Sequence, residues 1–70
     1  MPYRSNDDLP PAVRQHLPQH GCDIYRAAFN AAFAAHLDDP RREEAAHRIA
    51  WAAVKRSYVK AGARWVPIRP

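Results

Sequence analysis

The sequence predicts an all-α domain, with at most a small sheet added, in which three helices pack into one compact unit. The 70 residues allow a single domain, which would span residues 1–70. Hydrophobic residues make up 47% of the chain, and many of them are alanines, which favour closely packed helices. The prolines stand where helices begin or end, and the apolar residues between them recur at helical spacing.

The first helix is short and covers about residues 10–17. Asp8 is a candidate cap, and the prolines that follow it suit a first helical turn, whose N–H groups have no partner in the helix. The helix must end near Pro18, because the residue before a proline avoids the α region.

The second helix begins at Pro18 and extends to about residue 37. Its apolar residues cover a broad arc, so we expect it to be largely buried. One side of that arc consists of Ile24, Ala28, Ala31 and Ala35, and the next consists of Tyr25, Phe29, Ala32 and Phe33.

The third helix follows the short link Asp38-Asp39-Pro40, with Asp39 as its cap and Pro40 in its first turn. So short a link predicts that the second and third helices form an antiparallel hairpin. We expect the third helix to end near residue 61, with Gly62 as its stop. Its inner face would be Ala46, Ile49, Ala50 and Ala53, and a second apolar side would be His47, Trp51, Val54 and Tyr58.

The two ends of the chain each carry a short segment that contains an aromatic residue, at residues 3–5 and 64–66. They could pair as a two-stranded sheet across the termini. Two strands alone are marginal in water unless they pack on helices, and the pattern leaves the pairing open.

The composition excludes several classes of protein. The single cysteine, Cys22, can form no internal disulfide, which fits a reducing cytoplasm. An early position in a helix could activate its thiol, although a lone cysteine is more often an apolar filler. Residues 1–8 are polar and lack the apolar region of a signal peptide, and residues 27–37 are too short a run for membrane insertion.

The basic residues are concentrated in the C-terminal half of the chain. Residues 41–70 contain eight lysines and arginines against two glutamates, whereas residues 21–40 carry a net charge of −2. Such asymmetry attracts anionic partners. The candidate surface for an anionic partner or nucleic acid, called the basic set below, is Arg48, Lys55, Arg56, Lys60 and Arg64.

The sequence shows no catalytic residues, no cofactor site and no metal site. His47 would be the best catalytic candidate, but no nucleophile or orienting partner accompanies it, so we interpret it as a histidine packed at the edge of the core. His16 and His20 are four residues apart, but Pro18 interrupts the helical face that they would share. His36 near Asp38 and Asp39 offers too few ligands for a closed metal site.

Three blocks of sequence resemble the ChaB family over nearly the whole chain. They are Met1-Pro2-Tyr3-Arg4 with Asp8-Leu9-Pro10 and Leu17-Pro18-Gln19-His20; residues 23–30, DIYRAAFN; and residues 42–55, REEAAHRIAWAAVK, followed by Tyr58, Lys60 and Trp65. The resemblance implies three helices with a small sheet and no known catalytic activity. This chain differs from the longer bacterial pattern in its short link at residues 38–40 and in its tail, residues 66–70.

The resemblance leads to two hypotheses about function. The family is associated with the ChaA sodium/proton and calcium/proton antiporter, which implies a non-enzymatic regulatory or adaptor protein that acts through protein contact. Some ChaB-like proteins of viral origin are regarded as nucleic-acid binders, which implies sequence-tolerant binding of nucleic acid by the basic set. Exposed indoles of Trp51 and Trp65 beside these charges would favour nucleic acid, since indoles can stack on bases.

Overall fold

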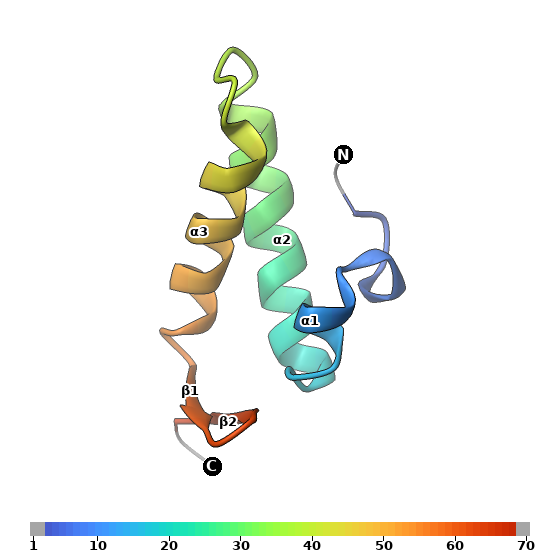
Figure 1. Ribbon diagram of the computed structural model, residues 1–70, viewed down its shortest axis with the longest axis vertical. Helices are drawn as coiled ribbons and strands as arrows, with labels where there is room; N and C mark the ends of the chain where they lie inside the picture. The colour runs from blue at the N-terminus through green and yellow to red at the C-terminus, as the bar shows by residue number, and fades with distance from the viewer. Residues whose placement is uncertain (1–2, 69–70) are drawn as a thin grey trace.

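The computed structural model describes residues 3–68 and measures 38 × 21 × 17 Å. Figure 1 shows α2 and α3 side by side and antiparallel, with α1 against the first half of α2 and a β-hairpin beyond the end of α3. The prediction of a helical domain with a small sheet is confirmed. The elements in chain order are the 3₁₀ helix η1 (Asn6–Asp8), α1 (Pro11–Arg14), α2 (Gln19–Ala35), α3 (Arg42–Val54), β1 (Tyr58–Ala61) and β2 (Arg64–Pro67).

The core lies between α2 and α3. On α2 the predicted side of Tyr25, Phe29, Ala32 and Phe33 is buried, and on α3 Ala46 and Ala50 are fully buried. The prediction that α2 is largely buried was wrong for Ala31 and Ala35, which are exposed. The prediction that Ile49 lies inside was also wrong, since it is 40% exposed. Each of these two helices packs against a single long neighbour, so only one stripe of apolar residues along the helix is buried.

The N-terminal segment is bound to α2 by a side chain. The amide of Asn30 accepts a hydrogen bond from the Tyr3 N–H and donates one to the Tyr3 carbonyl, both at 2.8 Å. The Tyr3 ring then lies 4.7 Å from the ring of Phe29, centroid to centroid. The pairing of residues 3–5 with residues 64–66, which the sequence left open, does not form, because the backbone groups of Tyr3 pair with α2 and β2 pairs with β1.

The helix boundaries differ from the predicted ones at both ends of α3. It begins at Arg42, and Asp39 accepts a hydrogen bond at 2.8 Å from the N–H of Arg41, so Asp39 stabilises the preceding turn and does not cap the helix. The helix ends at Val54, seven residues before the predicted end near residue 61. Asp8 likewise belongs to η1, where its carboxylate accepts from the Ser5 N–H at 3.3 Å, and does not cap α1.

The residues after α3 form the sheet. β1 and β2 are antiparallel, and Val59 lies opposite Val66 while Lys60 lies opposite Trp65. Gly62, expected to end the helix, is the first of the two residues that connect the strands and has a φ of 65°. A positive φ at this position is typical of the type II′ turn, which favours glycine.

Replacing Gly62 with alanine is expected to lower the free energy of unfolding by about 1–2 kcal/mol, because an L-residue pays a steric penalty at positive φ. A Cβ at this position would meet no atom within 4 Å, so the penalty comes from backbone conformation alone. Ala63→Ser, in the same turn, is the control and should change stability by less than about 0.5 kcal/mol. Equal denaturation midpoints for Gly62→Ala and the parent protein would contradict this explanation of the turn.

Candidate functional site

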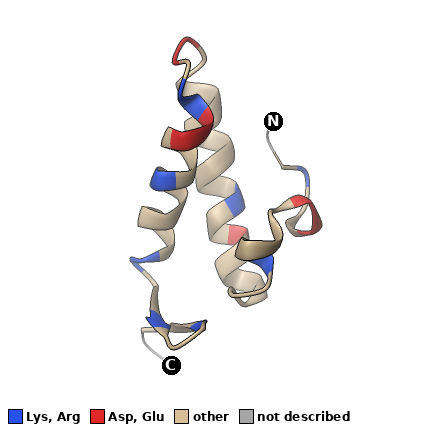
Figure 2. Ribbon diagram, in the orientation of Figure 1, with Lys and Arg blue, Asp and Glu red and all other residues tan. Residues whose placement is uncertain are grey.

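The basic set lies at the surface of the protein. Arg48, Lys55, Arg56, Lys60 and Arg64 are all exposed. Within residues 3–68, the one ion pair joins Arg26 to Asp23 at 3.6 Å, outside this set. Figure 2 shows acidic residues at η1, at the link between α2 and α3 and at the start of α3, whereas the later part of α3 and the hairpin carry basic residues. These charges are therefore free to meet an anionic partner.

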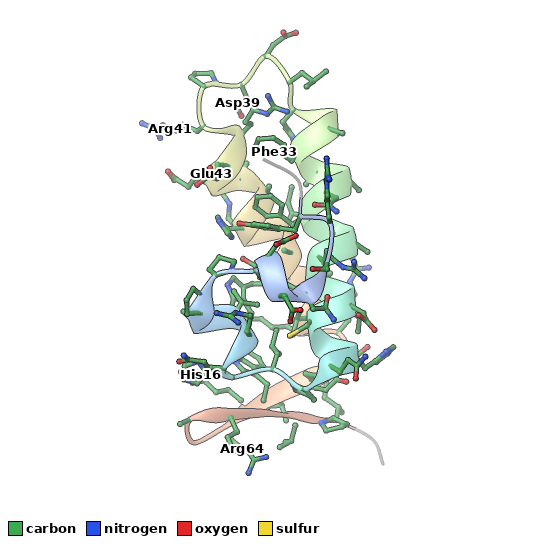
Figure 3. The ribbon with its side chains drawn as sticks, turned by 90° about the vertical axis from the view of Figure 1, so that its right-hand side faces the viewer. His16, Phe33, Asp39, Arg41, Glu43 and Arg64 are labelled. Carbon is green, nitrogen blue, oxygen red and sulfur yellow. The ribbon has the colours of Figure 1, made fainter. Side chains whose placement is uncertain are left out.

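The structure does not bring the five side chains of the basic set into one cluster. Arg48 and Lys55 are about two helical turns apart along one side of α3. Lys60 and Arg64 lie on opposite faces of the hairpin, because they belong to adjacent cross-strand pairs and side chains alternate between the faces. In Figure 3, Arg64 points away from the molecule at the end opposite Asp39.

Two neighbouring clefts surround β1 and bring three members of the basic set near this strand. Lys55 and Lys60 line a cleft of about 270 Å³ together with Tyr58, Val59, Trp65 and Ile68. Arg56 lines a second cleft of about 490 Å³ together with His20, Ser57, Tyr58, Pro67 and Ile68. Because Tyr58 and Ile68 belong to both, the two clefts adjoin.

Sequence reasoning missed the contribution of His20 and of β1 itself to this surface. His20 lies on α2, far along the chain from β1, and the ring of Tyr58 is 6.4 Å from its ring. The run Tyr58-Val59-Lys60 begins with two adjacent strong strand formers, a signal that could have indicated the strand.

The two indoles are stacked on each other at the edge of the core. The ring centroids of Trp51 and Trp65 are 5.1 Å apart, at an interplanar angle of 29°. Trp51 also meets Tyr25 edge to face, again at 5.1 Å. Both tryptophans are half-buried. This arrangement occupies much of the aromatic surface that a nucleic-acid base would need.

His47 is packed at the edge of the core, as its sequence context indicates. Burial, and secondly the nearby Tyr3, raise the pKa of Tyr25 well above its ordinary value, so its hydroxyl keeps its proton. This hydroxyl is hydrogen-bonded to Nδ1 of His47. The His47 ring lies 4.7 Å from the ring of Phe29. This hydrogen bond joins α2 to α3 at the edge of the core and gives His47 a structural role.

Cys22 is buried, with an exposed fraction of 4%. Burial, and secondly the charge of Asp23, raise the pKa of its thiol. A raised pKa lowers the thiolate fraction, so the thiol is an apolar filler and not an activated nucleophile.

Two of the histidines outside the core bond to a backbone carbonyl four residues earlier in the chain. Nδ1 of His16 lies 2.7 Å from the carbonyl oxygen of Ala12, and Nδ1 of His36 lies 2.7 Å from that of Ala32. In the part of the chain that the structure describes, no three histidine, cysteine, aspartate or glutamate side chains gather in a way that could hold a metal ion. Among the helices of residues 3–68, none is long and apolar enough to cross a membrane.

Comparison with known proteins places these features in a family. The family model ChaB matches residues 9–67. "Putative cation transport regulator ChaB" of Escherichia coli (strain K12) is 48% identical over 66 residues, which cover 86% of this chain and 87% of that protein. The protein of the same name from Shigella flexneri shows the same identity and coverage.

A solved structure shares the fold. The chain described as "NMR solution structure of the putative cation transport regulator ChaB" superposes with a TM-score of 0.83 at 44% identity, covering 94% of this chain and 97% of that one. The protein therefore belongs to the ChaB family.

Proposed function

We propose that this chain is a cytoplasmic, non-enzymatic regulator of cation transport that acts through contact with a protein partner. The partner would be a cation/proton antiporter or a factor that controls one. The relatives carry the name cation transport regulator, which supports the process but names no contact surface. The observation that carries the proposal is the exposed basic set, which has no ion pair within residues 3–68.

The basic set suits a partner with an acidic surface. Charges that are complementary across an interface speed association and reject partners of the same sign. Lys55, Arg56 and Lys60 surround clefts that also contain apolar side chains, including those of Pro67 and Ile68. A mixed surface of this kind is typical of a protein interface, in which an apolar centre is bordered by charged residues.

A transport assay with an added pull-down tests the proposal. Adding the chain to vesicles that contain the antiporter should change the rate of cation/proton exchange, and the antiporter or its regulator should be recovered with the chain. The double substitution Arg48→Glu plus Lys55→Glu should reduce recovery about tenfold at low salt, because it places negative charge opposite an acidic partner. Unchanged transport together with no recovered partner would contradict the proposal.

A matched control separates this surface from net charge. Arg4→Glu plus Arg14→Glu changes the net charge by the same amount, and both residues are exposed and lie in the N-terminal part of the chain. This variant should bind and regulate like the parent protein. If both double variants lost binding equally, the effect would come from total charge and not from the basic set.

Nucleic-acid binding is the second candidate, because exposed lysine and arginine side chains without ion pairs within residues 3–68 also suit phosphate groups. It predicts a mobility shift of DNA or RNA that is independent of sequence, weakens steeply with salt and is reduced by Arg48→Glu plus Lys55→Glu. We place nucleic-acid binding second because Trp51 and Trp65 stack on each other and so present less indole surface to nucleobases. No shift at low salt would exclude it.

A further inference from the structure

The two edges of the hairpin differ in the hydrogen bonds that they can offer. Ile68 donates its N–H to the carbonyl of Ser57, so the pairs 57–68, 59–66 and 61–64 carry the hydrogen bonds between the strands. The backbone groups of Tyr58 and Lys60 on β1, and of Trp65 and Pro67 on β2, consequently point away from the partner strand.

The edge of β2 is closed. The N–H of Trp65 donates to the carbonyl of His16 at 3.0 Å, which attaches β2 to the end of α1. Figure 3 shows His16 above the hairpin, on the side of the molecule where α1 ends. The other outward residue, Pro67, has no N–H to donate. An added strand could not pair along this edge.

The edge of β1 is open. Within residues 3–68, the outward N–H and carbonyl groups of Tyr58 and Lys60 make no hydrogen bond to another segment. The 270 Å³ cleft runs beside three consecutive residues of this strand, Tyr58, Val59 and Lys60. Lys60 is exposed, whereas Tyr58 is only 5% exposed, so the accessible part of this edge is centred on Lys60. Unpaired backbone groups at an exposed strand edge are a template for an added strand.

We propose that β1 is a docking edge, and that an extended acidic segment of the partner protein adds to it as a third, antiparallel strand. This inference rests on the proposed function and names the mode of contact. Main-chain hydrogen bonds supply affinity in this mode, and alternate side chains supply specificity.

The side chains around β1 define the pattern of the added segment. A residue opposite Lys60 shares the face of its ammonium group, so a carboxylate fits there. A residue opposite Val59 shares the face of Val59, which is 51% exposed and has the 38% exposed Val66 as its cross-strand neighbour, so an apolar side chain fits there. Since neighbouring residues of a strand face opposite sides, the segment alternates acidic and apolar residues.

The same charges disfavour a second copy of this chain on the edge. Pairing β1 with β1 of another copy would bring Lys60, Lys55 and Arg56 of both copies close together, and like charges across strands destabilise pairing. Lysine on an edge strand is a known means of preventing association between copies. An acidic partner converts this repulsion into attraction.

Synthetic eight-residue peptides that alternate glutamate and valine test the proposal with the intact 70-residue chain. In the expected register, the glutamate N–H groups face β1 and the valine N–H groups face away. A peptide that is N-methylated at its valines should bind, shift the amide resonances of Tyr58 and Lys60, and slow their hydrogen exchange. The peptide N-methylated at its glutamates should bind at least about tenfold more weakly, because it lacks the donors for β1.

Two protein variants separate the backbone from the charge. Lys60→Pro removes the outward N–H and leaves the hydrogen bonds between β1 and β2, so the hairpin signals of Val59 and Val66 should persist. Lys60→Gln removes the same charge and keeps the N–H. The proline variant should bind the valine-methylated peptide about fivefold more weakly than the glutamine variant.

Other results would overturn the docking edge. Equal binding of both methylated peptides would mean that charge alone attracts the partner, which would leave the proposed function intact. If the peptide left the amide resonances and hydrogen exchange of Tyr58 and Lys60 unchanged, β1 would likewise not be the docking edge. If the chain dimerised without peptide and the hydrogen exchange of the Lys60 amide slowed, the occupant of the edge would be a second copy of the chain. If an oligonucleotide bound and neither peptide did, the partner would be nucleic acid.

Discussion

Replacing Phe29 with alanine is expected to remove about 3–5 kcal/mol from the free energy of unfolding, the largest effect of any single substitution considered for this chain. The side chain is fully buried. Its ring is stacked on that of Phe33 at 5.6 Å, lies 4.7 Å from both Tyr3 and His47, and is parallel to Tyr25 within 12°. The cavity would therefore open where the N-terminal segment, α2 and α3 meet.

The consequence of this loss is severe because the domain is small. A folded chain of this size has a total stability of about 4–10 kcal/mol, so Phe29→Ala should be largely unfolded at physiological temperature. Thermal denaturation followed by circular dichroism measures the loss of stability. Leu37→Ala is the control, since that side chain is 65% exposed and its removal should cost less than about 0.5 kcal/mol. A melting temperature for Phe29→Ala within a few degrees of the parent would show that the aromatic cluster is not the centre of stability.

Enlarging Ala50 to leucine is expected to lower the free energy of unfolding by about 1–3 kcal/mol. Ala50 is fully buried on the side of α3 that faces α2, one turn after the equally buried Ala46. Small residues at these positions allow the two helices to approach closely, and a leucine would push them apart.

The same substitution elsewhere on α3 provides a matched control for Ala50→Leu. Ala52 lies on the same helix but is exposed, and leucine and alanine are both good helix formers. Ala52→Leu should therefore change the denaturation midpoint very little. If the two variants lost equal stability, helix propensity and not packing between α2 and α3 would explain the result.

Much of the candidate site could be predicted from the sequence, but its grouping could not. The concentration of bases in the C-terminal half is a property of the sequence, and their exposure follows from the cost of burying a charge. Their distribution depends on the hairpin. With residues 55–61 in a helix, Lys60 would continue the surface of α3; in β1 it lies opposite Trp65, beside a cleft that also contains Lys55.

The error at the end of α3 has a physical cause. Glycine is favoured both after a helix and in a tight β-turn, because both require a positive φ. Gly62, with a φ of 65°, satisfies either role, and no proline or second glycine marks the earlier end at Val54. Long-range packing decided between them: Tyr58 is buried in the core, and Trp65 stacks on Trp51 of α3.

The sequence by itself determined the helical class, the antiparallel pairing of α2 with α3, the buried aromatic side of α2 and the family. Each depends on local signals, such as apolar periodicity, proline positions and motif spacing, which the order of residues contains directly. Only the tertiary structure decided how the ends are held, with Asn30 bound to Tyr3 and Trp65 bound to His16. Those bonds join residues distant in the chain, so their partners are chosen by packing and not by local pattern.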